Sequence, residues 1–197
     1  MTDAPYANPF VFFRAWMKDA GATELNDPNA MTVATTTADG RPSARILLLK
    51  GMDDLGFVFY TNKQSRKAGD IAGNPHVALL FHWKSSRRQV RIEGVTEDVT
   101  DAEADAYYAS RTRESQLGAW ASDQSRPLTA REELERRVAE YDAKFAAEDV
   151  PRPPHWSGYR LLPSYFEFWQ DMPFRLHERF VFTKTAAGGW AGGRLFP

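Results

Sequence analysis

The sequence predicts an α+β fold that is mainly β, built as a small antiparallel barrel with peripheral helices. Seven or eight short segments rich in β-branched and aromatic residues alternate with turn signals, a pattern typical of antiparallel barrels. Capping-box patterns indicate helices in the middle of the chain. The 197 residues are enough to bury a conventional core. We therefore expect residues 1–197 to form a single domain, with a helical insertion at about residues 101–147.

The first element is predicted to be a helix over about residues 9–20. Asn8 suits the N-cap, Pro9 suits the first turn, and Gly21 suits the exit.

Strand and turn signals then alternate through the first half of the chain. A turn is expected at residues 51–56, and a short helix at residues 65–73, closed by Asn74-Pro75. The strands of this half are expected at residues 31–37, 43–50, 57–61, 76–83 and 88–98.

Two capping boxes, Thr100-Asp101-Ala102-Glu103 and Thr129-Ala130-Arg131-Glu132, predict the starts of the central helices. The first helix would cover about residues 101–110 and continue beyond them, and the second would cover 130–147. The last strands are expected at residues 159–162, 165–170, 179–184 and 190–195.

Composition excludes several classes of function. Twenty-five basic and 26 acidic residues give a net charge of −1, which argues against a broad nucleic-acid-binding surface. The absence of cysteine excludes disulfides and thiolate metal sites, and the four histidines lack metal-ligand spacing, so no metal site is predicted. The longest strongly apolar run, Ile46–Leu49, is far shorter than the ~20 residues of a membrane span. With no signal-peptide pattern at the start, we expect a cytoplasmic protein.

A basic cluster lies where a strand leads into the short helix. Lys63, Arg66 and Lys67 surround the first helical turn, where cations oppose the helix dipole. A bound phosphate would reverse that sign, because free amides, hydroxyls and cations would converge on one anion. The alternative is a solvated surface helix.

Three further clusters could bind an anion. On a continuous helix Tyr107, Arg111 and Ser115 would share one face and could clamp a phosphate, although such spacing also arises by chance. In an extended segment Arg175 and His177 would share a face with Arg179; the alternative is a surface ladder paired with acidic residues. The strand Arg45–Lys50 carries a cation at each end, which also fits side chains that reach to water.

Taken together, these clusters resemble the pyridoxine/pyridoxamine 5′-phosphate oxidase family. The resemblance covers about residues 27–197. It rests on the ordered motifs R-x-x-L-L-K (Arg45–Lys50), F-Y-T-N-x-x-S-R-K (Phe59–Lys67), N-P-x-V-A-L-L-F (Asn74–Phe81), R-Q-V (Arg88–Val90), Y-x-x-x-R-x-x-x-S-Q-x-G-A-W (Tyr107–Trp120), Q-S (Gln124-Ser125) and E-F-W-Q…R-L-H-x-R (Glu167–Arg179). The resemblance implies an antiparallel split β-barrel of the FMN-binding type that works as a homodimer, with flavin at the subunit interface.

The resemblance also implies roles for individual residues. Arg66 and Lys67 would hold the FMN phosphate, and Arg175 and His177, the implied catalytic residues, would lie against the substrate's pyridine ring. The full FMN site would comprise Arg45, Ile46, Leu47, Leu48, Leu49, Lys50, Tyr60, Thr61, Arg66, Lys67, Gln89, Gln124, Ser125, Trp169 and Arg179. The substrate site would comprise Lys50, Tyr107, Arg111, Ser115, Arg175, Leu176 and His177.

The implied reaction is oxidation of pyridoxamine or pyridoxine 5′-phosphate to pyridoxal 5′-phosphate, with O₂ as electron acceptor and release of H₂O₂. Two alternatives remain open: a related FMN-dependent oxidase of another substrate, as in phenazine biosynthesis, and a non-catalytic protein that binds FMN or pyridoxal phosphate. The presence of Lys50, Tyr107, Arg111 and Ser115 favours a phosphorylated substrate. One departure from the family pattern is the stretch Asp171–Phe174, where the family commonly has glycine.

Overall fold

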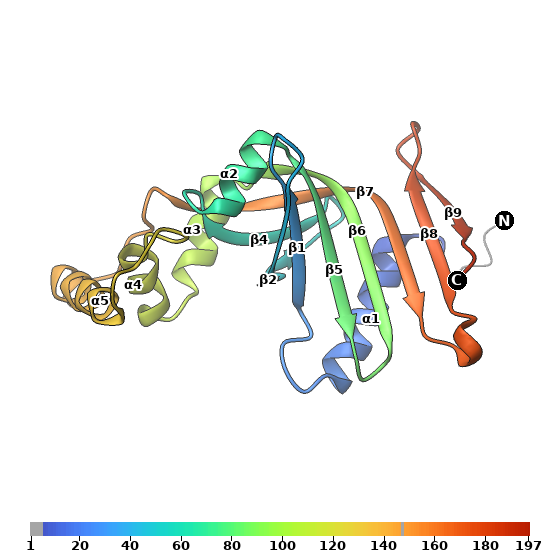
Figure 1. The fold of residues 1–197 in the computed structure, drawn as a ribbon, viewed down its shortest axis with the longest axis horizontal. Coiled ribbons are helices and arrows are strands. Elements are labelled where there is room, and N and C mark those ends of the chain that lie inside the picture. Colours follow the sequence, from blue (N-terminus) through green and yellow to red (C-terminus); the bar gives the residue numbers. More distant parts are fainter. Residues whose placement is uncertain (1–5, 147) are drawn as a thin grey trace.

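The computed structural model describes residues 6–146 and 148–197, in which helices surround a curled antiparallel sheet (Figure 1). The α-helices of these residues are α1 (Pro9–Thr23), α2 (Arg66–Gly73), α3 (Asp101–Ala109), α4 (Arg113–Ala121) and α5 (Arg131–Phe145). The strands are β1 (Ala30–Thr36), β2 (Pro42–Leu48), β3 (Gly51–Met52), β4 (Phe57–Asn62), β5 (His76–Trp83), β6 (Arg88–Asp98), β7 (Trp156–Gln170), β8 (Glu178–Lys184) and β9 (Trp190–Arg194). A short 3₁₀ turn, η1 (Pro173–Arg175), follows β7. The predicted mainly β class with peripheral helices is confirmed.

The strands belong to one sheet with the order β2-β1-β5-β6-β7-β4-β3, and β8 and β9 extend it from β7. Every paired strand is antiparallel. Along one edge, β7 pairs first with β4, through Trp156–Leu161, and then with β8, through Tyr165–Gln170. The sheet therefore divides into two arms along β7.

Strand β7 runs unbroken where the sequence predicted two separate strands, at residues 159–162 and 165–170. Pro163 cannot donate a ladder hydrogen bond, but it lies opposite Gly94, at a register shift in β6. A Cβ at Gly94 would lie 2.1 Å from the carbonyl oxygen of Leu162, so only glycine permits this close approach. The bulge lets the strand pass the proline without ending.

Helix α1 packs an aromatic face on the sheet. Phe10, Phe13 and Trp16 are buried at helical spacing, and the Phe12 ring stacks on Phe168 with centroids 4.1 Å apart. The predicted cap is confirmed, because the Asn8 side chain accepts from the Phe10 backbone N–H at 2.8 Å. The predicted exit at Gly21 is wrong. Gly21 does not adopt the positive φ of a glycine helix exit, and the helix continues to Thr23.

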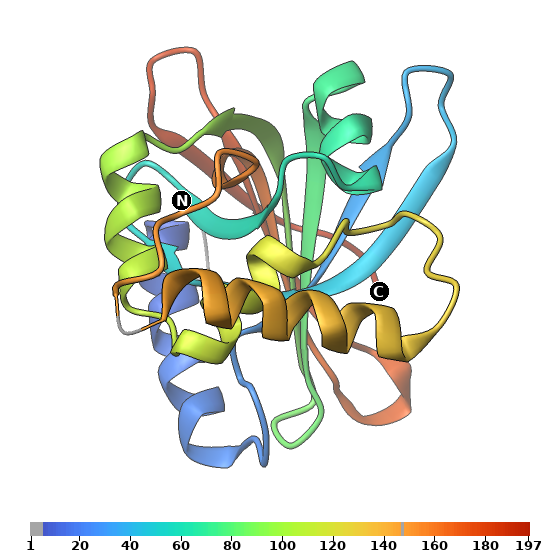
Figure 2. The ribbon, with the colours of Figure 1, turned by 90° about the vertical axis from the view of Figure 1, so that its left-hand side faces the viewer.

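Helices α3, α4 and α5 gather beyond one end of the sheet, on the left in Figure 1 and toward the viewer in Figure 2. The capping box at Thr100 is confirmed. The Thr100 side chain accepts a hydrogen bond from the Glu103 backbone N–H, and the Glu103 side chain accepts one from the Thr100 backbone N–H. The capping box predicted at Thr129 is wrong, because α5 starts after Ala130 without a side-chain cap.

The predicted turn at residues 51–56 starts instead with the short strand β3. Within the described residues, no helix combines the length and apolar composition that a membrane crossing requires.

An ion-pair cluster around a buried arginine fixes α3 against the sheet. The Arg160 side chain on β7 is only 8 % exposed and pairs with both Asp53 and Glu103. Hydrogen bonds from Thr100 lower the pKa of Glu103, and the Arg160 charge lowers it further, so this carboxylate stays ionised. Helix α3 is thereby held close to β4 and β7.

Candidate active site

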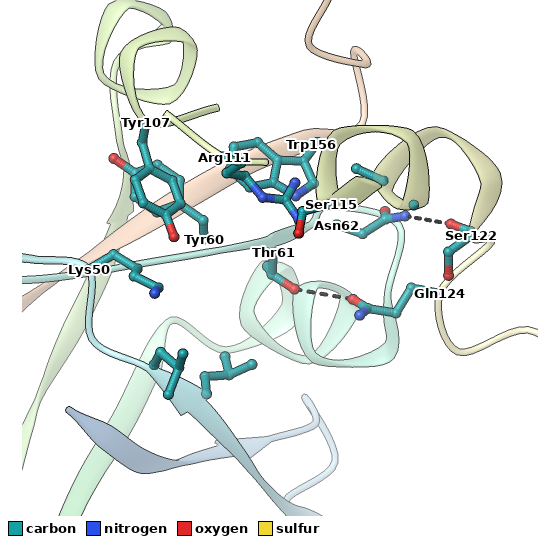
Figure 3. Close-up of a pocket in the computed structure, with 14 residues that line it drawn as sticks. Lys50, Tyr60, Thr61, Asn62, Tyr107, Arg111, Ser115, Ser122, Gln124 and Trp156 are labelled. Carbon is teal, nitrogen blue, oxygen red and sulfur yellow. Dashed lines mark hydrogen bonds between the residues drawn. The ribbon is translucent and has the colours of Figure 1, made fainter. Parts of the chain in front are cut away.

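A cavity of about 460 Å³ opens between this helical end and strands β2 and β4 (Figure 3). Small-molecule sites commonly occupy about 300–1,000 Å³. The cavity brings together many predicted site residues: Leu47, Leu48, Lys50, Tyr60, Thr61, Tyr107, Arg111, Ser115 and Gln124. It is also lined by residues that the sequence did not single out: Asn62, Gly118, Ala119, Ser122 and Trp156.

Three aromatic rings stack along one wall of this cavity. Tyr60 lies parallel to Trp156, with centroids 5.3 Å apart, and Tyr107 stacks on Tyr60 at 4.1 Å. The Tyr60 ring lies close against β7 because Gly158 has no side chain; a Cβ there would lie 2.7 Å from the ring. Burial raises the pKa of Tyr60, and nearby Glu103 and Tyr107 raise it further, so the phenol stays neutral.

Arg111 lies in a break between α3 and α4. The sequence predicted a continuous helix here, and that prediction is wrong. The Thr112 side chain accepts from the Ser115 N–H and caps a new helix, α4. Tyr107, Arg111 and Ser115 nevertheless line the same cavity, from the end of one helix and the start of the next.

The Arg111 guanidinium forms no ion pair with a carboxylate among the described residues. Its Nη1 is buried and has no hydrogen-bond partner within residues 6–146 and 148–197. Burial lowers the pKa of Arg111, and Tyr108 and Tyr107 offset this only in part. A buried unsatisfied donor is costly, so Nη1 marks a place for an acceptor that the chain does not supply.

Ser115 and Lys50 add donors to the same cavity. Ser115 lies in the first turn of α4, where free amides and the helix dipole favour an anion. Lys50 follows β2, and its ammonium group lies 5.9 Å from the centre of the Tyr107 ring. These side chains form the first anion position, which we call the Arg111 position and define as Lys50, Tyr107, Arg111 and Ser115.

A second cationic position lies beneath the opposite wall. Lys67 is 7 % exposed, and its ammonium group donates to Thr61 Oγ1 at 3.1 Å, Ser65 Oγ at 3.2 Å and Gln124 Oε1 at 2.9 Å. All three acceptors are neutral. Burial and the nearby Arg45 charge lower the pKa of Lys67 to about 8.

Arg66 and Arg45 complete this second position, which we call the Lys67 position and define as Arg45, Ser65, Arg66 and Lys67. Arg66 is exposed at the first residue of α2 and makes no ion pair with any residue that the structure describes. Arg45 donates to Thr35 Oγ1 at 2.8 Å and lies 3.6 Å from Asp70. One carboxylate thus faces three cations at a helix N-terminus, which suits a bound phosphate.

Several other residues of the predicted flavin site lie close to this cavity without lining it. Leu49 packs against the core, whereas Ile46 is 63 % exposed on the edge strand β2. Ser125 follows Gln124 in the loop after α4, where its φ of 72° is in the left-handed region.

The remaining predicted site residues lie at the far end of the sheet. Gln89 on β6 pairs with Trp169 on β7, which pairs with Arg179 on β8. Trp156 and Trp169 are near opposite ends of β7, and at about 3.3 Å per residue they are separated by roughly 40 Å along the strand. None of the far group, Gln89, Trp169, Arg175, Leu176, His177 and Arg179, lines the cavity of its own chain. In Figure 1 the segment between β7 and β8 lies on the opposite side of the molecule from α4 and α5.

The segment from Arg175 to Arg179 is not extended as the shared-face prediction required. Phe174 and Arg175 have φ values of 60° and 63°, and regular strand begins only at Glu178. The Asp171–Phe174 departure explains part of this: His177 Nδ1 lies 3.1 Å from Asp171 Oδ1 and 3.2 Å from the Met172 backbone N. The His177 ring also lies 4.6 Å from the Trp169 ring, whereas Arg175 is exposed.

A buried carboxylate holds Arg179. Glu167 is 4 % exposed and accepts from Arg179 Nε at 2.7 Å and from Arg91 Nη2 at 2.6 Å. These hydrogen bonds outweigh the effect of burial and lower the pKa of Glu167. Arg179 Nη1 also donates to the Phe196 carbonyl at 2.8 Å, which ties the C-terminal segment to the sheet.

Trp156 is the main cavity residue that the sequence analysis missed. It starts β7 directly after a proline-rich connector, and nothing in its local pattern distinguishes it from a core residue. Asn62 and Ser122 were missed for a similar reason, because their 3.4 Å contact joins segments 60 residues apart.

Comparisons with known proteins point to one family. A family model described as "Pyridoxamine 5'-phosphate oxidase" matches residues 17–145, and one described as "Pyridoxine 5'-phosphate oxidase C-terminal dimerisation region" matches residues 156–197. A protein of Caulobacter vibrioides named "Pyridoxine/pyridoxamine 5'-phosphate oxidase" is 62 % identical over 96 % of this chain and 85 % of its own length. One of Gluconobacter oxydans with the same name is 59 % identical over the full length of both chains.

Solved structures show the same architecture. PhzG from Burkholderia lata 383, in complex with tetrahydrophenazine-1-carboxylic acid, superposes with a TM-score of 0.93 at 31 % identity, covering 99 % of this chain and 95 % of that one. A pyridoxamine 5′-phosphate oxidase-related, FMN-binding protein from Nostoc punctiforme shares the fold with a TM-score of 0.76 at 17 % identity, over the full length of both chains.

The divided antiparallel sheet and its cationic cavity define a split-barrel protein with a small-molecule site. The chain belongs to the pyridoxamine 5′-phosphate oxidase family. The predicted family and the predicted split β-barrel are both confirmed.

Proposed function

We propose that this protein binds FMN and oxidises pyridoxamine 5′-phosphate and pyridoxine 5′-phosphate to pyridoxal 5′-phosphate, with O₂ as electron acceptor. The observation that carries the proposal is a pair of anion positions at one aromatic cavity. The Arg111 position lines the cavity, and Lys67 contacts Thr61 and Gln124, which line it. The Lys67 position and the Arg111 position each hold cations that the chain leaves largely without carboxylates. A phosphorylated flavin and a phosphorylated substrate would each supply one of the missing anions.

The Lys67 position suits the flavin phosphate. Lys67 and Arg66 would pair with it, and the Ser65 hydroxyl, which makes no cap hydrogen bond to α2, would donate to it. FMN supplies the redox chemistry when bound, accepting a hydride equivalent from the substrate and passing electrons to O₂. The chain's task is to orient the two ligands and to exclude water between them.

The Arg111 position suits the substrate phosphate. Arg111 Nη1 offers a buried donor, and Ser115 adds a hydroxyl at a helix N-terminus. The flat wall made by Tyr60, Tyr107 and Trp156 gives a pyridine ring a surface on which to stack. This arrangement favours a phosphorylated aromatic substrate over an unphosphorylated one.

A homodimer would complete the site. Arg175 and His177, which the family resemblance places against the pyridine ring, lie at the end of the sheet opposite the cavity of their own chain. A second copy related by a two-fold axis could bring its far group to this cavity. The match of residues 156–197 to a dimerisation region supports that arrangement.

A second candidate is a flavin-dependent oxidase of another substrate. The structural likeness to PhzG, in complex with a tetrahydrophenazine carboxylic acid, supports it. The relatives at 56–62 % identity and the intact Arg111 position favour the phosphate ester.

Peroxide release tests the proposal directly. The purified protein should be yellow and should release FMN, not FAD, on acid treatment followed by chromatography. It should produce H₂O₂ with pyridoxamine or pyridoxine 5′-phosphate, and little with the unphosphorylated vitamers. Bound FAD would contradict the cofactor assignment, and equal turnover of phosphorylated and unphosphorylated compounds would contradict the substrate assignment.

A further inference from the structure

Arg111 differs from the arginines around it in how its charge is held. Arg113 pairs with Asp142 at 2.9 Å, and Arg152 pairs with Asp101 at 2.8 Å. Arg111 forms no ion pair with a carboxylate in the described part of the chain. Its guanidinium carbon lies instead 4.9 Å from the centre of the Trp156 ring and 5.6 Å from that of Tyr108. Two aromatic faces take the place of a counter-ion, and Figure 3 shows one of them, Trp156, beside Arg111.

Trp156 is itself held rigidly. It is 6 % exposed, and its ring is parallel to Tyr60 within 1°. Its backbone N–H donates to the Pro153 carbonyl at 2.9 Å, and its own carbonyl accepts from Arg152 at 2.8 Å. The indole ring therefore presents a fixed face to Arg111.

We propose that Trp156 is a positioning residue for the substrate phosphate, acting through Arg111 by a cation–π contact. The inference rests on the proposed function and adds to it a residue outside the predicted clamp. A carboxylate in this place would occupy the guanidinium N–H groups and compete with the phosphate. An aromatic face stabilises the cation without accepting hydrogen bonds from its N–H groups. Those N–H groups therefore stay available to the ligand. Trp156 thus orients Arg111 while leaving its buried Nη1 free.

The test compares Trp156→Leu with Trp156→Phe, which keeps an aromatic face. Trp16→Leu is a matched control, because Trp16 is 7 % exposed and carries Arg88 over its ring at 4.6 Å, yet it lies in the aromatic core around α1. Two constants are measured for each variant: KM for pyridoxamine 5′-phosphate by peroxide release, and Kd for pyridoxal 5′-phosphate by calorimetry on the FMN-loaded protein. FMN content and thermal unfolding report on folding.

Trp156→Leu should raise both constants about tenfold, equivalent to about 1.4 kcal/mol, within the range of a desolvated cation–π contact. The turnover number and the FMN content should change little. Trp156→Phe should stay within about threefold of wild type, and Trp16→Leu should leave both constants unchanged.

A double-mutant cycle separates positioning from packing. If Trp156 acts through Arg111, Trp156→Leu should have no further effect on either constant in an Arg111→Ala background. An effect of equal size in that background would overturn the inference, as would unchanged constants in the single variant. If the wild type releases no peroxide, the proposed function fails, whereas the pyridoxal 5′-phosphate titration still decides the role of Trp156.

Discussion

The Lys67 ammonium group donates to the Gln124 side-chain oxygen at 2.9 Å, although the two residues are 57 positions apart. This contact joins α2 to the loop that follows α4. It therefore connects the Lys67 position to the helices α3, α4 and α5. Gln124 is one of three neutral acceptors for this buried cation, with Thr61 and Ser65. A bound phosphate would supply a stronger one, because it adds the attraction between opposite charges to the hydrogen bond.

Removing the two cations Arg66 and Lys67 from the Lys67 position should abolish flavin binding without unfolding the chain. We expect Arg66→Ala/Lys67→Ala to be folded and largely colourless, because both cations proposed to hold the phosphate are gone. The measurement is flavin absorbance per chain beside far-ultraviolet circular dichroism. Arg131→Ala/Arg136→Ala is the control, since it removes the same charge from exposed ion pairs on α5. A strongly coloured Arg66/Lys67 variant would place the flavin phosphate elsewhere.

The affinity for FMN should fall as the pH rises through about 8, the lowered pKa of Lys67. The deprotonated amine no longer pairs with the phosphate. The same shift has an opposite effect on the flavin-free protein. Between pH 8 and the ordinary Lys pKa of about 10.5 the unfolded chain binds more protons at this residue, so its contribution to the free energy of unfolding rises with pH.

Fluorescence titrations of FMN at pH 7 and pH 9.5, together with urea unfolding of the flavin-free protein, measure both trends. Lys67→Met should remove this part of each pH dependence, while Arg45, Arg66 and Asp70 remain in place. An identical pH profile for wild type and Lys67→Met would show that Lys67 does not titrate in this range.

Arg111→Ala should raise KM for the phosphorylated substrate by about 30- to 1,000-fold, since losing a charge-assisted contact in a desolvated site costs about 2–4 kcal/mol. FMN content should stay near that of wild type, because the flavin phosphate is assigned to the Lys67 position. Arg113→Ala is the neighbouring control, as Arg113 is neutralised by Asp142. Steady-state kinetics with pyridoxamine 5′-phosphate and unphosphorylated pyridoxine make the comparison. An equal loss on both substrates would mean that Arg111 supports structure rather than phosphate binding.

Light scattering should show a homodimer, and two inactive variants should complement each other within it. In a dimer of Arg111→Ala with Arg175→Ala, one site would combine both defects and the other would be intact. We expect about half of the wild-type activity from such dimers, isolated through two different affinity tags. The control is a dimer in which both chains are Arg111→Ala and each carries one of the two tags. These dimers should stay inactive. If the mixed dimers are inactive too, each site is built from one chain.

Gly158→Ala should destabilise the fold by about 1–3 kcal/mol and disturb the cavity, because overpacking forces neighbours to move. The added Cβ would lie 2.7 Å from the Tyr60 ring and 2.9 Å from the Phe59 carbonyl oxygen. Gly21→Ala, the same substitution in α1 with no atom within 4 Å, should instead stabilise by about 0.5–1 kcal/mol. Urea unfolding curves of the two variants should therefore shift in opposite directions.

Much of the sheet could be read from the sequence because strand signals are local. The strands at residues 76–83 and 88–98 lie where alternation and turn residues placed them. The capping box at Thr100 was also predictable, since its atoms lie within four residues of one another. The predicted end of α1 at Gly21 was wrong, because glycine permits an exit but does not impose one.

The sequence by itself determined the fold class, most of the strand positions and the residue types that can hold two phosphates. Only the tertiary structure decided how those residues are grouped. The break before Thr112, the passage of β7 beyond Pro163, and the contact of Arg111 with Trp156 depend on partners distant in the sequence. The separation of Arg175 and His177 from the cavity likewise follows from the length of β7. Short-range capping and propensity act within a few residues, whereas register, burial and cation–π contacts are fixed only when the whole sheet has formed.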